Sequence, residues 1–298
     1  MRFRVCVLVV LLGLIFAGMS VNAQTDVIAL EDRLLSVPTL YNFESERLAE
    51  IFALGQRLGS RANVFTTVGD SNTTNGDFLY PIGLNDGDQC VWGAFEHLRE
   101  TVAFFDQSPD GDAANSFTHA TTSVAAFRGF TSVAVLDPLW ATDPVCAGGE
   151  SPLLCEIRVV QPSVAVIMLG GRDVLALTAE DYRQAMIEVV ETLMAQGVIP
   201  ILTTFVVLEE RQDVYPLSLE MNAALIDIAD AAEIPLINLW AAASELPDHG
   251  IGPDRSHLRA RIGAFCDFTG AQYEVGGTLR NLLTLQALDL LRLNFLEL

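Results

Sequence analysis

Apolar positions follow two alternating patterns along this chain. Short apolar and β-branched runs predict strands, and apolar residues three and four positions apart predict helices. The predicted strands cover residues 62–68, 163–169, 198–205 and 234–239, and the predicted helices cover 42–58, 92–105, 178–197, 217–232 and 278–296. Strands that alternate with helices across short joints indicate a right-handed parallel α/β sheet.

Two of these strands run into glycine turns. The first ends at Gly69-Asp70-Ser71 and the second at Gly170-Gly171. In parallel α/β sheets, ligands bind beyond the carboxyl ends of the strands. These turns are therefore candidate positions for a ligand-binding or catalytic site.

The polar stretch at 106–121 is predicted to be a surface loop. It contains Asp106, Asp110 and Asp112, whose carboxylates are suitable ligands for Ca²⁺. Their spacing does not match an EF-hand loop, so a solvated acidic turn is the preferred interpretation. No cysteine or histidine spacing suggests zinc, and no metal or other cofactor is predicted.

The first 23 residues are typical of a secretory signal peptide. Arg2 and Arg4 precede the apolar run 5–16, and Val21-Asn22-Ala23 predicts cleavage after Ala23. A retained anchor is the alternative, but the run is shorter than the roughly 20 residues that span a bilayer. Residues 24–298 are then a single domain in a secreted or extracytoplasmic protein. No stable membrane insertion is expected after cleavage, because no second segment is long and apolar enough to cross a membrane.

The acidic amino-acid composition argues against one class of partner. The 298 residues contain 38 acids and 17 bases, all of them arginine, for a formal net charge of −21. Such a chain repels phosphate backbones, which makes nucleic acid an unsuitable partner.

The cysteine count suggests disulfides. Cys6 leaves with the signal segment, and an even set of four remains. Cys146 and Cys155 flank a loop that contains Gly and Pro, so the preferred pairing joins them and joins Cys90 to Cys266. Buried free thiols are the alternative.

Candidate chemistry begins at Ser71. A serine hydroxyl is a weak nucleophile until a base accepts its proton, and a serine after a strand is more often a helix cap. However, Asp254 and His257 lie three residues apart, a spacing that lets the carboxylate accept from Nδ1 of the imidazole. Nε2 is then free to take the proton from Ser71.

Three sequence blocks resemble the motifs of the SGNH, or GDSL-type, hydrolases. They are VGDSNT (68–73), LGGRDV (169–174) and PDRSHL (253–258), in the family's order and spacing. The resemblance implies a flavodoxin-like three-layer α/β/α sandwich with a central parallel sheet. It also implies Ser71 as nucleophile, His257 as base, Asp254 as its orienting partner, and ester hydrolysis as the activity.

The same resemblance implies the groups that bind the oxyanion. These are the backbone N–H of Ser71 and of Gly129, and Gly129 has the ordinary turn glycine as its alternative. In the third block the family carries an Asn as a further donor, whereas this chain carries Arg172. Arg172 either folds into the oxyanion hole, points outward, recognises an anionic group on the substrate, or marks a site that has lost activity. Asp173 resembles the structural partner of this block, and a helix cap is its simpler role.

The leading prediction is therefore a secreted serine hydrolase. It cleaves a carboxylic ester of a small molecule or a carbohydrate, an acetyl ester among the options, through an acyl-enzyme. The alternative is a binding protein of the same fold whose catalysis is weak or lost because of Arg172. A third interpretation, an unrelated α/β fold, predicts that Ser71 and His257 lie far apart.

Overall fold

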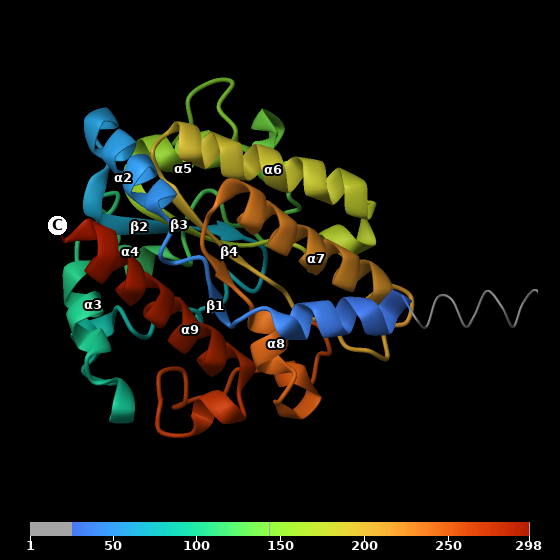
Figure 1. The fold of residues 1–298 in the computed structure, drawn as a ribbon. Coiled ribbons are helices and arrows are strands. Elements are labelled where there is room, and N and C mark those ends of the chain that lie inside the picture. The colour runs from blue at the N-terminus through green and yellow to red at the C-terminus, as the bar shows by residue number, and fades with distance from the viewer. Residues whose placement is uncertain (1–25, 143, 298) are drawn as a thin grey trace, which may run out of the picture.

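In the computed structural model, which describes residues 26–142 and 144–297, five strands form one sheet in the order β1-β5-β4-β3-β2 (Figure 1). The strands are β1 (Leu40–Tyr41), β2 (Arg61–Gly69), β3 (Pro162–Met168), β4 (Ile199–Thr203) and β5 (Leu236–Ile237). Strands β2 to β5 pair in parallel, and β1 adds an antiparallel edge. The predicted α/β sheet is confirmed. The edge strand β1 was not predicted, because two residues carry no periodicity. The predicted signal peptide, 1–23, lies outside the described residues.

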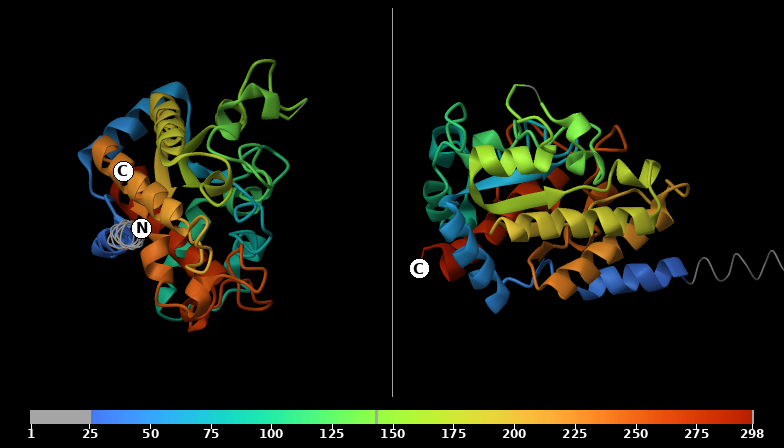
Figure 2. Two further views of the ribbon diagram at one scale, coloured as in Figure 1. Left: turned by 90° about the vertical axis from the view of Figure 1, so that its right-hand side faces the viewer. Right: turned by 90° about the horizontal axis from the view of Figure 1, so that it is seen from above.

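Helices cover both faces of this sheet. They are α2 (Glu46–Leu58), α3 (Leu98–Phe104), α4 (Ser116–His119), α5 (Pro152–Val160), α6 (Ala179–Ala195), α7 (Tyr215–Ala232), α8 (Leu239–Ala243) and α9 (Gly276–Leu291). Figure 1 shows α5, α6 and α7 over one face and α3 and α9 over the other. Residues 26–36 form a further helix beside α7 (Figure 2). The arrangement is the expected three-layer α/β/α sandwich.

Capping residues set the helix ends. The predicted helix from residue 42 begins only at Glu46, because Asn42 has a left-handed φ of 63° and the Ser45 side chain caps the helix by accepting from Arg47 N. It ends where predicted, at Gly59, with φ 96°. Helix α6 likewise begins after Thr178, whose side chain accepts from Asp181 N.

Two further predicted segments differ from the structure. The helix expected over 92–105 is divided into a 3₁₀ turn, Gly93–Phe95, and α3, because backbone hydrogen bonds between Val91 and the segment 266–268 fix the start of this region. The loop expected at 106–121 contains α4 and buries its second half, since Phe117 packs edge-on against Phe65 of β2. Only the first part of that segment is a surface loop.

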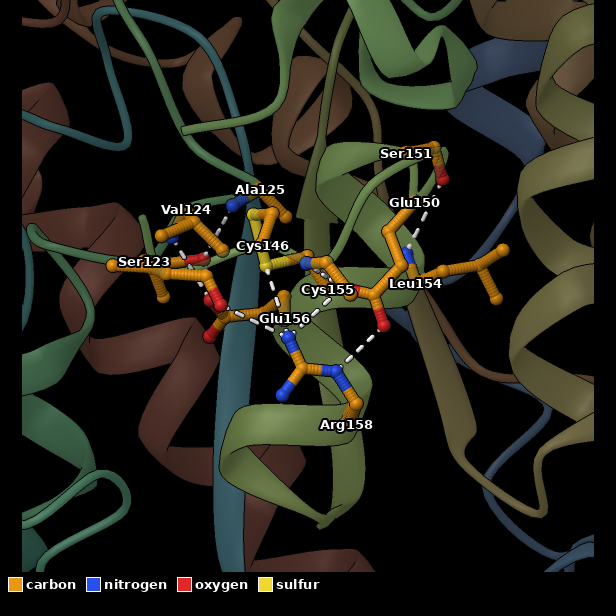
Figure 3. The surroundings of a disulfide bond; sticks show 12 residues. Ser123, Val124, Ala125, Cys146, Glu150, Ser151, Leu154, Cys155, Glu156 and Arg158 are labelled. Carbon is orange, nitrogen blue, oxygen red and sulfur yellow. Dashed lines mark hydrogen bonds and ion pairs between the residues drawn. A yellow bond between two sulfur atoms is a disulfide. The ribbon is translucent and has the colours of Figure 1, made fainter. Parts of the chain in front are cut away.

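Both predicted disulfides form. One joins Cys90 to Cys266 across 176 residues, and the other joins Cys146 to Cys155 across nine. Figure 3 shows the second, beside which Arg158 bridges to Glu150 on the surface of the protein. Within the described ranges, no helix is long and apolar enough to cross a membrane.

Candidate active site

The turn after β2 carries Ser71. The register pairs Gly69 with Met168, which places this turn beside Gly170 at the same edge of the sheet. A Cβ at Gly69 would collide with the Thr73 side chain and with the Met168 carbonyl, so only glycine allows the chain to turn this tightly.

Ser71 and the distant loop that contains Asp254 and His257 meet at this edge. Ser71 Oγ lies 2.9 Å from His257 Nε2, and His257 Nδ1 lies 2.6 Å from Asp254 Oδ2. The other carboxylate oxygen, Asp254 Oδ1, accepts from the backbone N–H groups of Ser256 and His257 at 3.1 and 3.0 Å. The three side chains are in line for proton transfer from the hydroxyl to the imidazole.

These hydrogen bonds also affect the acid. Partial burial acts to raise the pKa of Asp254, but the hydrogen bonds from the His257 ring and from the two backbone N–H groups outweigh it and lower the pKa. The carboxylate is therefore ionised at neutral pH. An ionised carboxylate holds the imidazole in the tautomer that leaves Nε2 free to accept a proton.

A second segment reaches the Ser71 turn through the backbone. Phe127 N donates to Gly69 O at 3.1 Å, and Gly69 N donates to Ala125 O at 3.2 Å, so this segment forms an isolated parallel bridge beside the last residue of β2. Gly129 follows two residues later with a φ of 88°, and a side chain there would meet no atom within 4 Å. Its conformation favours glycine, and the segment brings it to the same cavity as Ser71.

The turn after β3 supplies Arg172 and Asp173. Asp173 is fully buried, and its Oδ1 accepts from both the N–H and the hydroxyl of Ser132 at 2.7 Å. Burial raises the pKa of Asp173, and the hydrogen bonds from Ser132 only partly offset the increase. Asp173 thus ties the segment after Gly129 to the turn after β3, which agrees with its predicted structural role.

An open cavity of about 940 Å³ lies over these turns. Every predicted site residue contributes to its lining: Ser71, Gly129, Arg172, Asp254 and His257. Arg172 is exposed, and its guanidinium forms no hydrogen bond or ion pair with any other described residue. The sequence therefore identified a set of residues that the fold brings together, although it left the direction of Arg172 open.

A buried arginine, which the sequence analysis missed, supports the nucleophile turn from below. Arg280 of α9 donates to Asn72 O at 2.8 Å and to Thr73 Oγ1 at 3.1 Å, and it stacks 3.5 Å from the Phe78 ring. Burial lowers the pKa of Arg280 to about 9, against the opposing effect of the Asp70 carboxylate. It remains a cation at neutral pH.

Asp70 is the acidic partner of this buried charge. Its side chain is 4% exposed and accepts from Asn72 N at 2.9 Å. Burial raises the pKa of Asp70, and the Asn72 hydrogen bond and the Arg280 charge only partly offset that shift. Asp70 and Arg280 both stabilise the shape of the turn through these hydrogen bonds, and neither lies in line with Ser71.

Asn72 links the two halves of the site. Its Oδ1 accepts from Leu258 N at 3.0 Å, directly after His257. The chain directly after Asn72 forms turns. No local pattern identifies a contact between residues 186 positions apart.

A second buried network holds the segment before Gly129. His119 lies between Asp110 and Glu156, with contacts of 3.0 and 2.7 Å. Glu156 also accepts from Val124 N at 2.8 Å (Figure 3). Burial acts to lower the pKa of His119, but the two carboxylates outweigh it and raise the pKa. Across residues 26–142 and 144–297, no group of three or more His, Cys, Asp or Glu is arranged to hold a metal ion.

Comparisons with known proteins find similarity in solved structures alone. No family model matches the sequence, and no curated protein matches it. The chain is similar to TesA, at 18% identity and a TM-score of 0.41, over 65% of this chain and 88% of that one. It is also similar to a lipase/acylhydrolase from Enterococcus faecalis, at 16% identity and a TM-score of 0.45, over 74% and 93%.

A third similar structure is a GDSL-like lipase from Bacteroides thetaiotaomicron. Its identity is 15% and its TM-score 0.43, over 81% of this chain and 98% of that one. Assigning a function to this chain therefore depends on the geometry of its own site.

Proposed function

We propose that this protein is a serine hydrolase of the SGNH, or GDSL, type that cleaves carboxylic esters through an acyl-enzyme. The observation that carries the proposal is the continuous chain of contacts from Ser71 Oγ through His257 to Asp254, at 2.9 and 2.6 Å. A serine, an imidazole and a carboxylate in this order are the parts of a general-base-activated nucleophile.

The reaction follows from these contacts. Ser71 Oγ attacks the ester carbonyl carbon while His257 Nε2 takes the hydroxyl proton, and Asp254 stabilises the resulting imidazolium. The tetrahedral intermediate collapses, the C–O bond to the alcohol breaks, and His257 returns its proton to the leaving alkoxide. Water then attacks the acyl-enzyme by the same route and releases the acid.

Hydrogen-bond donors at the end of the sheet stabilise the negative charge of the tetrahedral intermediate. The backbone N–H groups of Ser71 and Gly129 are the proposed oxyanion donors, each worth roughly 3 kcal/mol in such enzymes. Arg172 reaches the same cavity with a permanent positive charge and adds to the field there.

The test uses a short-chain aryl ester and a fluorophosphonate probe on the purified protein with residues 1–23 removed. We expect a burst of phenol, probe attached at Ser71, and loss of both in Ser71→Ala. Ser36→Ala is the matched control, because Ser36 lies on the exposed helix at residues 26–36 and its hydroxyl donates only to Arg33 O. A wild-type protein that neither hydrolyses nor reacts would favour the alternative of a binding protein with this fold.

Secretion and the acyl group are further parts of the proposal. Cleavage after Ala23 predicts that protein released from expressing cells begins at Gln24, which N-terminal sequencing reads directly. An acetylated polysaccharide is the natural carbohydrate ester to test, with released acetate as the measurement. Secreted protein that keeps Met1 would contradict the cleavage.

A further inference from the structure

Most of the described arginines pair with other side chains or backbone groups, but two arginines in the proposed active site do not. Among the described arginines, three have a guanidinium group that forms no hydrogen bond or ion pair with another described residue: Arg57, Arg128 and Arg172. Two of the three, Arg128 and Arg172, line the cavity that contains Ser71. Most of the others are paired, including Arg255 and Arg259 on the neighbouring loop, which contact Glu210 and Asp248.

The acids of the cavity do not neutralise this pair. Asp70 and Asp254 are the carboxylates in its lining. Asp70 is buried beneath the turn, and Asp254 is bonded to His257 and to two backbone N–H groups. The lining therefore carries two exposed guanidinium groups and one exposed carboxylate, that of Asp254, so its accessible side-chain charge is net positive, in a chain whose formal net charge is −21.

The two arginines come from the two segments that build the site. Arg128 precedes Gly129, the proposed oxyanion donor, and Arg172 follows Gly171 after β3. Both side chains are exposed. Asp173 and Ser132 tie these two segments together at 2.7 Å, so the backbone that carries both cations is fixed relative to Ser71.

From this arrangement we infer that the substrate is an ester that carries an anionic group, which Arg128 and Arg172 bind while Ser71 attacks the carbonyl. Guanidinium groups bind carboxylate, sulfate and phosphate oxygens through paired N–H donors. The inference rests on the proposed function and specifies its substrate class. Because the net charge of the protein repels anions, a local positive pair is needed for such a substrate to bind.

Matched esters test this inference. On the alcohol side, phenyl acetate is compared with phenyl acetate bearing a para-sulfonate. On the acyl side, phenyl hexanoate is compared with monophenyl adipate. We expect the wild type to prefer the anionic member of at least one pair, and the preferred pair identifies the side that carries the charge.

Variants assign the preference to the two side chains. Arg128→Gln and Arg172→Gln should each lower the ratio of kcat/KM for anionic over neutral ester by about threefold, and the double variant by about tenfold. Arg57→Gln is the matched control. Arg57 is in the last turn of α2, outside the cavity, and its loss changes the net charge by the same amount. Its ratio should equal that of the wild type.

Three results would overturn the inference. The wild type prefers neither anionic ester, or the double variant keeps the wild-type ratio, or Arg57→Gln lowers the ratio as much as the cavity variants do. If Arg172 served only the oxyanion, Arg172→Gln would slow both members of each pair equally and leave the ratio unchanged.

A binding measurement separates this inference from the proposed function. Titration of the anionic product of the preferred pair, para-hydroxybenzenesulfonate for the alcohol side or adipate for the acyl side, into Ser71→Ala by calorimetry needs no turnover. The added double substitution Arg128→Gln/Arg172→Gln should weaken binding about tenfold, and unchanged binding counts against the inference. If phenyl acetate hydrolysis survives Ser71→Ala, the proposed function fails while the titration still decides the role of the arginines.

Discussion

The two halves of the candidate active site are built in opposite ways. The nucleophile turn is packed into the protein, with Asp70 and Arg280 buried beneath it. The Asp254 and His257 side chains lie in an open loop, 55% and 38% exposed. One half is fixed by the core, and the other is held by a few hydrogen bonds.

This difference has electrostatic consequences. Burial raises the pKa of Asp70, whereas the pKa of Asp254 is lowered, because its hydrogen bonds outweigh partial burial. Asn72 joins the halves through its bond to Leu258 N. Substitutions on the buried side should therefore cost stability, and substitutions on the open side should cost activity.

The largest effect is expected on the open side. Asp254→Asn should lower kcat by roughly 10⁴-fold, because the amide favours the wrong imidazole tautomer. The free energy of unfolding should change by less than about 1 kcal/mol, since the residue is exposed. Ester hydrolysis and urea unfolding measure the two quantities. A stable variant with wild-type kcat would remove Asp254 from the proposed triad.

On the buried side, Arg280→Met should destabilise the protein by roughly 3–5 kcal/mol. The change leaves Asn72 O without its donor and Asp70 without a nearby cation. Urea unfolding is the measurement. Adding Asp70→Asn should recover part of the loss, whereas adding Asp227→Asn, on the surface of α7, should recover none. Additive losses in both double variants would show that Arg280 and Asp70 do not interact.

A smaller effect tests the link between the halves. Asn72→Ala should lower kcat about fivefold with little change in KM, because one hydrogen bond worth about 1 kcal/mol positions His257. Asn294→Ala is the control, since Asn294 donates one side-chain hydrogen bond to Phe43 O and neither residue lines the cavity. Equal kcat in the two variants would show that Asn72 is not a positioning residue.

The smallest effect concerns pH. The pKa of Asp70 is raised above 3.8, so its contribution to stability is largest below pH 3.8 and is lost as pH rises through its folded pKa. The pKa of Asp254 is lowered, so its contribution is present above pH 3.8 and is lost as pH falls through its folded pKa. The free energy of unfolding of Asp70→Asn and of Asp254→Asn is measured by urea unfolding across acidic pH. The slopes of this free energy against pH in the two variants should differ from the wild-type slope in opposite directions. Slopes that differ from wild type in the same direction would contradict the opposite pKa shifts of Asp70 and Asp254.

The sequence by itself predicted the parallel strands, the turns that end β2 and β3, both disulfides and the five candidate site residues. Strand and helix periodicity is a local property, and the motif blocks fix residue types at short spacing. The same reasoning missed β1. It also extended α2 to residue 42, because a hydrophobic pattern does not reveal the left-handed φ of Asn42.

Tertiary structure alone decided what surrounds the motif residues. The contact of Arg280 with the Ser71 turn, the bond from Leu258 N to Asn72, and the arrival of Arg128 in the same cavity as Arg172 join residues far apart in the chain. Such contacts depend on how helices and loops pack over the sheet, and no local pattern encodes them. The charge balance of the site arises at that level, because burial and neighbouring charges exist only once the chain has folded.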